Sequence, residues 1–178
     1  MDSCERKHPA HLPNLARTNT SVMLSVTVCA SDRAVNTFAN EPMHRILRVA
    51  WEAAGSYVVG AYVLMPDHIH LFCAPAAPEV ENVARWVRYW KSLVTRSVRG
   101  RPVGMACVRM PENGDERTLV PPGPRPGVFQ RDCWDTQLRR GESYHDKWEY
   151  VRNNPVRRGF VDDADMWPYW GVLRELVW

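Results

Sequence analysis

The sequence lacks the features that would place it in several large protein classes. Its five cysteines are odd in number and widely spaced, and no two of them form a CxxC pair. This pattern argues against a disulfide framework and against a zinc site with thiolate ligands, and it suits a reducing cytoplasm. No apolar run reaches the roughly 20 residues that a membrane-spanning helix needs. The N-terminus shows no apolar segment typical of a secretory signal.

The chain also lacks a strong excess of charge of either sign. Lys and Arg together number 23 and Asp and Glu number 20, so the formal net charge is +3. Such a small excess is weak evidence for a nucleic-acid partner, and only a local cluster of arginines would be informative. With 178 residues, of which 45% are hydrophobic, the chain is long enough for one domain with a sizeable core.

What the chain does contain is an ordered series of strand and helix patterns. We expect strands at 21–30, 57–65, 68–73 and 128–136, from their apolar and β-branched runs. Helices are expected at 42–54, 79–99 and 143–153, and Asn154-Pro155 should end the last of them. This order predicts an α+β fold, a ferredoxin-like split βαβ sandwich with a central antiparallel sheet and an additional C-terminal helix.

These patterns divide the chain into three parts. Residues 1–20 are expected to form a flexible N-terminal arm, residues 21–170 a single domain, and residues 171–178 a C-terminal tail. Within the domain, residues 100–127 are rich in Pro, Gly and charge, and they predict a long loop. The aromatic residues near the C-terminus are expected to pack back on the domain.

The most informative pattern is the pair His68 and His70, which directly follows a predicted turn at Pro66-Asp67. Residues two apart in a strand point to the same face, so the two imidazoles should lie side by side while Ile69 points into the core. Paired imidazoles suit a divalent-metal site but need a third ligand. An HxH pair alone is more often structural than catalytic, and Asp67 is interpreted as a turn residue rather than a ligand.

The last predicted helix supplies residues that would complete such a site. Tyr150 and Asn154 are four positions apart and share a helix face, whereas Tyr144 and Trp148 lie on another face that suits the core. The amide oxygen of Asn154 would be the third metal ligand, and the phenol oxygen of Tyr150 a nucleophile. Two nitrogens and one oxygen with open positions suit Mg²⁺ or Mn²⁺. Attack on a DNA phosphodiester would give a 5′-phosphotyrosine, which can be rejoined without ATP.

Two groups of basic residues are candidate contacts for DNA. One lies on the outer surface of the helix expected at 79–99, interleaved with Trp86 and Tyr89, and the other flanks Tyr150. Arginines hold phosphates and aromatic side chains stack unpaired bases, although a basic helix surface is as often simply solvated. The candidate DNA-binding residues are Arg85, Arg88, Lys91, Arg152, Arg157 and Arg158.

Two stretches together carry a resemblance to a known family. YVLMPDHIHLF, at 62–72, is followed by WEYVRNNPVRRGFV, at 148–161, and then by a Trp-Pro pair. In this order they resemble the single-tyrosine HUH transposases, and most closely the REP-associated tyrosine transposases, over about residues 21–170. By position, His68 and His70 match the metal-binding histidines of that family. Tyr150 matches its catalytic tyrosine and Asn154 its third, amide-type ligand.

The resemblance implies a ferredoxin-like nuclease that cuts and joins single-stranded DNA with Mg²⁺ or Mn²⁺ and recognises imperfect palindromic, REP-like hairpins. It implies a cytoplasmic, nucleoid-associated enzyme that does not engage a membrane and is a monomer rather than a dimer. A non-catalytic, domesticated binder of structured single-stranded DNA is the alternative. A histidine-triad nucleotide hydrolase is disfavoured because Phe72 stands where its third alternating histidine would be.

Overall fold

The computed structural model describes residues 22–77, 82–100, 127–138 and 144–176. Its centre is a five-stranded antiparallel sheet in the order β4-β1-β3-β2-β5. The strands are Leu24–Cys29 (β1), Tyr57–Leu64 (β2), His68–Pro75 (β3), Trp134–Gln137 (β4) and Trp170–Val172 (β5). Strands β1 to β4 and the helices between them follow the split βαβ connectivity. The predicted α+β, ferredoxin-like fold is therefore confirmed, with the histidine strand β3 at the centre of the sheet.

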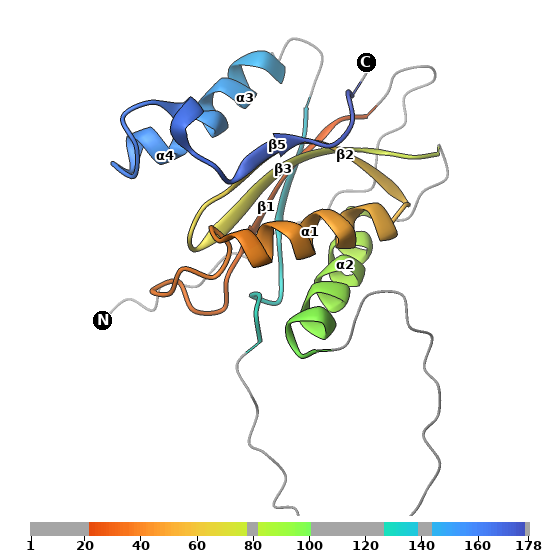
Figure 1. Ribbon diagram of the computed structural model, residues 1–178. Coiled ribbons are helices and arrows are strands. Elements are labelled where there is room, and N and C mark those ends of the chain that lie inside the picture. The colour runs from red at the N-terminus through yellow and green to blue at the C-terminus, as the bar shows by residue number, and fades with distance from the viewer. Residues whose placement is uncertain (1–21, 78–81, 101–126, 139–143, 177–178) are drawn as a thin grey trace, which may run out of the picture.

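Two helices, Glu41–Ala53 (α1) and Val83–Val98 (α2), cover one face of the sheet (Figure 1). Helix α1 begins where the Asn40 side chain accepts a hydrogen bond of 3.0 Å from the backbone N–H of Met43, and a proline occupies its first turn. The residues that this face buries form the larger of two cores. Trp90 of α2 and Leu71 of β3 are both fully buried in it.

The other face is covered by the C-terminal part of the chain (Figure 1). Helices Tyr144–Arg152 (α3) and Asn154–Arg157 (α4) are followed by a 3₁₀ turn, Ala164–Met166 (η1). The ring of Phe72 packs against Tyr144 and Trp148, with ring centroids 5.0 and 6.1 Å apart. These contacts belong to the smaller core. The expectation that Tyr144 and Trp148 face the core is thus confirmed.

Helix α2 and strand β4 are both shorter than the sequence indicates. Helix α2 begins at Val83, because the Asn82 side chain caps it by accepting a hydrogen bond of 2.7 Å from Ala84 N–H. Before β4 only an isolated bridge between Phe129 and Ala30 continues the pairing. The carbonyls of residues 130 and 132 turn to the ammonium group of Lys91 instead of joining the sheet.

Helix α3 ends at Arg152, directly before Asn153 and close to the end expected from Asn154-Pro155. The sequence did not predict the short helix α4, which begins at Asn154 and has Pro155 in its first turn. A proline is tolerated in the first turn of a helix because the N–H that it lacks would have no partner there. The short interruption at Asn153 keeps Tyr150 and Asn154 close together on one helical segment.

The C-terminal segment packs back on the domain, as expected from its aromatic residues. The indole N–H of Trp167 donates to the carbonyl of Leu64 at 2.9 Å. Strand β5, which the sequence did not predict, pairs with β2. The N-terminal arm and most of the loop 100–127 lie outside the described residues, so the division into domain, arm and tail stays a prediction. None of the described helices is long and apolar enough to cross a membrane.

Candidate metal and nucleophile site

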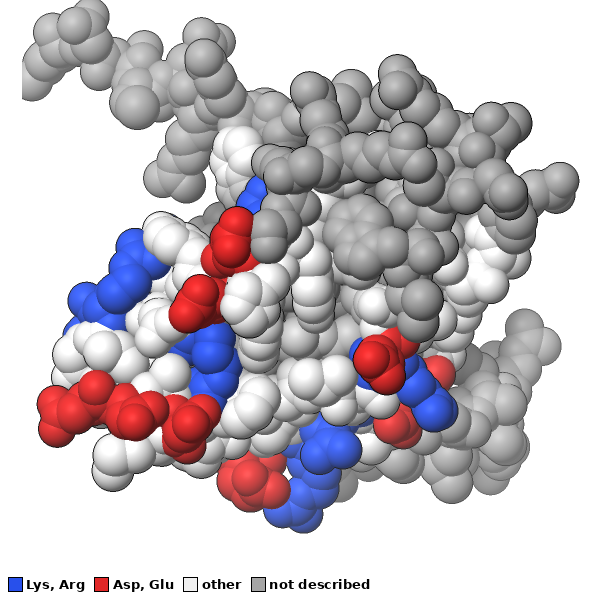
Figure 2. Space-filling model, turned by 90° about the horizontal axis from the view of Figure 1, so that it is seen from above, with Lys and Arg blue, Asp and Glu red and all other residues white. Residues whose placement is uncertain are grey.

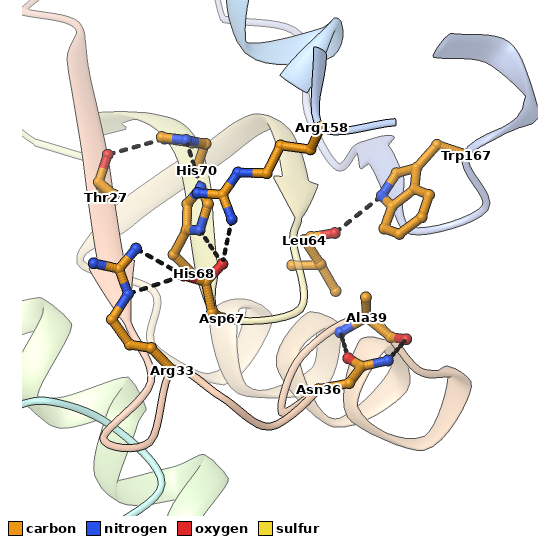
Figure 3. Close-up of polar contacts among 10 residues, drawn as sticks. All are labelled: Thr27, Arg33, Asn36, Ala39, Leu64, Asp67, His68, His70, Arg158 and Trp167. Carbon is orange, nitrogen blue, oxygen red and sulfur yellow. Dashed lines mark hydrogen bonds and ion pairs between the residues drawn. The ribbon is translucent and has the colours of Figure 1, made fainter. Parts of the chain in front are cut away.

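The two histidines of β3 point to the face that α3 and α4 cover. Ile69, between them, is fully buried in the core on the other face. The Nε2 atoms of His68 and His70 lie 3.1 Å apart, and their ring centroids are 4.7 Å apart (Figure 3). The alternation of a strand therefore brings the two imidazoles together, as the sequence indicates.

Each imidazole is held at its other nitrogen (Figure 3). His68 Nδ1 lies 2.7 Å from Asp67 Oδ1, and His70 Nδ1 lies 2.9 Å from the hydroxyl of Thr27 on the neighbouring strand β1. Partners of this kind fix the orientation of metal-binding histidines and turn the Nε2 lone pairs toward the ion. The two Nε2 atoms thus face each other, and both could turn toward one ion.

Burial keeps both imidazoles neutral near pH 7. It lowers the pKa of His68, although Asp67 opposes this effect. Burial, with the nearby charges of His68 and Arg158, lowers the pKa of His70 to about 3. Because the ionised Asp67 carboxylate can only accept, the proton of neutral His68 lies on Nδ1 and its Nε2 carries a lone pair. The hydroxyl of Thr27 can donate or accept, so it accommodates either tautomer of His70.

Asp67 links the histidine strand to two other segments. One of its oxygens accepts two hydrogen bonds from Arg33, of 2.9 and 2.7 Å, and the other lies 3.3 Å from Arg158 Nη1 (Figure 3). Burial alone would raise the pKa of Asp67, but the hydrogen bonds with His68 and Arg33 outweigh it and lower that pKa to about 2. Asp67 is therefore a buried, ionised group that orients His68 and holds α4 beside the histidine strand.

This role of Asp67 was not predicted from the sequence, and neither Arg33 nor Thr27 was recognised as part of the site. A carboxylate next to an HxH pair is a signal that could have identified Asp67. Arg33 carries no such signal, because it lies 34 positions from its partner in a loop of ordinary composition. Thr27 becomes recognisable only from the register, which sets it directly opposite His70.

Tyr150 lies on the exposed side of α3. Its side chain is 58% exposed, and Arg157 Nη2 donates to its hydroxyl oxygen at 2.8 Å. The guanidinium carbon of Arg157 also lies 4.0 Å from the centre of the Tyr150 ring. Asn154 is partly buried between them, with Arg157 Nη1 at 3.4 Å from its Oδ1. These three side chains form one cluster along the α3–α4 segment.

The Asn154 amide contains a buried nitrogen, Nδ2, that has no hydrogen-bond partner among the described residues. A buried polar atom without a partner is costly, so such an atom needs an explanation. Among the described residues no third His, Cys, Asp or Glu joins the histidine pair as a metal ligand. An amide is thus the kind of ligand that remains to be considered.

Two of the six candidate DNA-binding residues are buried and engaged within the protein. Lys91 is 8% exposed, and its ammonium group donates to the carbonyls of Gln130 and Asp132, at 3.1 and 3.0 Å. Arg152, also 8% exposed, pairs with Asp165 at 2.9 Å and lies over the ring of Trp170. The expected position of Lys91 on the outer surface of its helix is therefore wrong. Arg152 flanks Tyr150 in the sequence, as expected, but its guanidinium group is bound within the protein.

The other four candidates are at least partly exposed, but they lie in two separate layers. Arg85 and Arg88 lie on α2, on the opposite side of the sheet from the histidines, whereas Arg157 and Arg158 lie on or next to α4. Trp86, expected to alternate with the α2 arginines on the surface, is 3% exposed and donates its indole N–H to a backbone carbonyl. The α2 surface is therefore not part of the site around the histidines.

The described residues on the side that carries α3 and α4 form no continuous basic surface (Figure 2). Figure 2 looks down on this side and shows Lys and Arg interspersed with Asp and Glu among the described residues. Positive charge at the histidine pair comes from particular residues instead. Arg33 and Arg158 share the single carboxylate of Asp67, and their side chains are 53% and 45% exposed. Two cations against one anion leave this corner net positive.

The chain is similar to known proteins in sequence and in fold. No family model matches the chain. A protein of Haemophilus influenzae (strain ATCC 51907 / DSM 11121 / KW20 / Rd) named "Putative REP-associated tyrosine transposase" is 27% identical over 117 residues, which cover 65% of this chain and 59% of that protein. The match thus spans less than two thirds of the relative's length.

A solved structure shows the same fold. It is described as "Structure of the REP associates tyrosine transposase bound to a REP hairpin", and it superposes with a TM-score of 0.62 at 17% sequence identity. The superposition covers 89% of this chain and 82% of that chain. The resemblance of this chain to the REP-associated tyrosine transposases, first visible in its histidine and tyrosine motifs, is confirmed by both a relative in sequence and a neighbour in fold.

Proposed function

We propose that this protein is a metal-dependent endonuclease and strand transferase that cleaves and rejoins single-stranded DNA beside REP-like hairpins through Tyr150. The observation that carries the proposal is the convergence of two neutral imidazoles, with Nε2 atoms 3.1 Å apart and both Nδ1 atoms held. The segment that bears Tyr150 and Asn154 covers the same face of the sheet, and Arg158 ties it to Asp67.

The donor set fits a hard divalent ion. Two imidazole nitrogens and one amide oxygen, with positions left open for phosphate oxygens and water, would suit Mg²⁺ or Mn²⁺. Turning the Asn154 amide by 180° would exchange its oxygen with the unpartnered buried nitrogen and make the oxygen available as the third ligand, with loss of the 3.4 Å contact from Arg157 Nη1.

When bound, the ion would polarise the phosphoryl oxygens of the DNA and orient the scissile bond. The Tyr150 oxygen then forms a bond to phosphorus while the bond from phosphorus to the 3′-oxygen breaks. The phenol proton passes to solvent, and the departing 3′-oxygen takes up a proton from solvent. Arg157, which already donates to the Tyr150 oxygen, stabilises the negative charge of the phenolate form.

Rejoining is the reverse of cleavage. A 3′-hydroxyl attacks the phosphotyrosine, the bond from phosphorus to the Tyr150 oxygen breaks, and the new phosphodiester retains the energy of the old one. Arg157 then stabilises the leaving phenolate, so one guanidinium serves both directions. The choice of hairpin DNA as substrate follows the relatives, since the solved neighbour is bound to a REP hairpin. We further propose that the enzyme acts as a monomer in the cytoplasm, associated with the nucleoid.

The test is a denaturing-gel assay for a covalent protein–DNA adduct. The substrate is a REP-like hairpin with single-stranded flanks, incubated with Mn²⁺ or with EDTA. The adduct is expected with Mn²⁺ alone and should disappear in Tyr150→Phe, which keeps hairpin binding. Tyr144→Phe is the matched control, because Tyr144 lies six positions earlier in the same helix and packs on Phe72. An adduct that persists in Tyr150→Phe would contradict the assignment of the nucleophile.

A non-catalytic binder of structured single-stranded DNA is the second candidate. The specific observation in its favour is that Arg157 engages both Tyr150 and Asn154, so these side chains are also explained as an internally bonded cluster. The same assay separates the two functions. Tight hairpin binding without any adduct in Mn²⁺ would support the binder, whereas a metal-dependent adduct excludes it.

A further inference from the structure

One tryptophan of this protein is placed unlike the others. Seven of its eight tryptophans lie within the described residues, and six of these pack against another aromatic ring. Trp134, the first residue of β4, has no such ring contact among the described residues and is 54% exposed. A large indole at the surface is typical of a recognition site, because it supplies much contact area at little entropic cost.

The register of the sheet aligns this indole with the histidine pair. Trp134 lies directly opposite Thr27, and Thr27 lies directly opposite His70. Directly opposed residues of antiparallel strands share a face, so all three side chains lie on the histidine side of the sheet. The preceding residue, Cys133, points to the opposite face, because it is buried in the core there. With strands about 4.8 Å apart, Trp134 and His70 are separated by roughly 10 Å along this row.

Among the described residues, no helix covers the part of the sheet between Trp134 and His70, and this part is polar. Helix α3 covers the opposite half of this face through the contacts of Tyr144 and Trp148 with Phe72. The half formed by β1 and β4 presents hydroxyl groups instead. Thr27, which is partly exposed, lies between Trp134 and His70, and the partly exposed Ser25 and the exposed Thr136 lie in the adjacent row, level with Phe72. These three hydroxyl groups form a strip between the histidine pair and the edge strand β4, and Trp134 lies at its outer end.

The charge beside the histidine pair, at the inner end of the strip, indicates which kind of ligand the strip would bind. The half-exposed guanidinium groups of Arg33 and Arg158 face one carboxylate there, so the corner beside His68 is net positive. A ligand that fits both ends carries negative charge near the histidines and a flat aromatic group about 10 Å away. Single-stranded DNA has this pattern, because its unpaired bases can stack on an aromatic side chain while its phosphates meet arginines. Bases inside a duplex are already stacked and cannot reach the indole.

We propose that Trp134 is a stacking platform for an unpaired base in the single-stranded DNA flanking the hairpin, and that the strip of Ser25, Thr27 and Thr136 guides this strand toward the histidine pair. The proposal rests on the proposed function for its substrate class, and it adds the place on the protein that grips the flank. Stacking tolerates every base, so Trp134 contributes affinity and positioning more than sequence choice.

The experiment measures equilibrium binding by fluorescence anisotropy in the Tyr150→Phe background, where no cleavage occurs. Two labelled DNAs are compared, a REP-like hairpin alone and the same hairpin with a single-stranded flank of about 8 nucleotides. Trp134→Ala should weaken binding of the flanked DNA by about 5- to 150-fold, the effect of losing one stacked base, and leave the bare hairpin unchanged. Trp134→Phe retains a stacking ring and should keep most of the affinity.

Two further variants make the result specific. Trp134→Leu keeps an apolar side chain without a flat ring, so it should behave like Trp134→Ala if stacking is the interaction. Val172→Ala is the matched control, because Val172 is 57% exposed on the other edge strand, β5, and should change neither affinity. Unchanged binding of the flanked DNA by Trp134→Ala, or an equal loss for both DNAs, would overturn the proposal.

The two experiments distinguish a failure of the stacking proposal from a failure of the proposed function. If the protein with Tyr150 intact forms no adduct but Trp134→Ala loses flank-dependent affinity, the stacking platform stands and the catalytic function falls. If the adduct forms but the flank-dependent loss is absent, the catalytic function stands and the platform falls.

Discussion

The two faces of the central sheet carry different chemistry on the same strands. On β3, Ile69 and Leu71 point to the α1/α2 face and are fully buried among apolar side chains. His68 and His70, which alternate with them, point to the α3/α4 face and join a network of hydrogen bonds and ion pairs. The apolar side chains of a strand pack in the core on one face of the sheet, and this packing holds the reactive groups rigidly on the opposite face.

The helices on the two faces of the sheet also differ in their roles. The larger core lies under α1 and α2, whose buried stripes include Leu47, Trp51 and Trp90. The α3–α4 segment rests on a smaller core and brings Tyr150, Arg157 and Arg158 to the histidine side. Substitutions on the first side should therefore change stability, and those on the second should change activity.

The largest expected effect is that of His70→Ala on adduct formation. Removing one of two imidazole ligands would abolish stable metal binding, and with it charge stabilisation of several kcal/mol, so the rate should fall by at least about 100-fold. Single-turnover kinetics in Mn²⁺ measure this loss. Thermal unfolding without metal should change little, and a normal adduct rate would show that the pair is structural.

Leu71→Ala, one position away, should give the reverse. Truncation of a fully buried leucine in the larger core is expected to lower the free energy of unfolding by about 2–5 kcal/mol. Urea denaturation measures this change. The adduct rate per folded molecule should stay close to that of the unsubstituted protein, and a selective loss of rate would mean that the two faces are coupled.

Asp67→Asn should weaken the site without removing a ligand. The amide loses the charge that orients His68 and attracts Arg33 and Arg158. Substitution of such outer partners typically costs about 10- to 100-fold in metal affinity or activity. Calorimetric titration with Mn²⁺ measures the affinity. Arg45→Gln, which breaks an exposed ion pair on α1, is the control and should leave the affinity unchanged.

Arg157→Gln should slow both cleavage and rejoining by a similar factor of about 10, the size of one hydrogen bond to a charged group. Because the residue would act on the phenolate in both directions, the fraction of adduct at equilibrium should not shift. Quench-flow measurements of the two rates test this. A loss of hairpin affinity with unchanged rates would instead assign Arg157 to the DNA backbone.

The last prediction concerns pH and the metal-free protein. The pKa of His70 lies at about 3 in the folded state, below its ordinary value of 6.5, so the unfolded chain binds a proton first as the pH falls. The stability associated with neutral His70 is present above about pH 6.5 and declines toward pH 3. Urea denaturation at about pH 7 and pH 4.5 should show this decline, and His70→Gln should reduce it. Equal slopes in both proteins would contradict the burial of a neutral imidazole.

The features of the two faces that follow from local periodicity could be predicted from the sequence. Alternation in β3 predicted the side-by-side histidines, and helical spacing predicted the common face of Tyr150 and Asn154. It did not predict the burial of Lys91 and Trp86, because these side chains are polar or amphipathic and their partners lie far away in the chain. The short helix α4 was not predicted for a local reason, since Pro155 indicates a helix end but also fits the first turn of a new helix.

The outer partners of the site depend on tertiary structure. Asp67 gathers Arg33 and Arg158 from segments 34 and 91 residues away, and only the folded sheet brings them together. The position of Trp134 in the histidine row likewise depends on strand register, which no pattern within β4 reveals.

The central claim is that the histidine pair and the tyrosine-bearing helix form a single metal site. A crystal structure with Mn²⁺ and the flanked hairpin, with data collected for anomalous scattering, tests it most directly. The expected result is one Mn²⁺ ion bonded to Nε2 of His68 and of His70 and to the amide oxygen of Asn154, with the Tyr150 oxygen facing the scissile phosphorus. A metal-free histidine pair, or an ion whose ligands lack either the histidine pair or Asn154, would contradict the account.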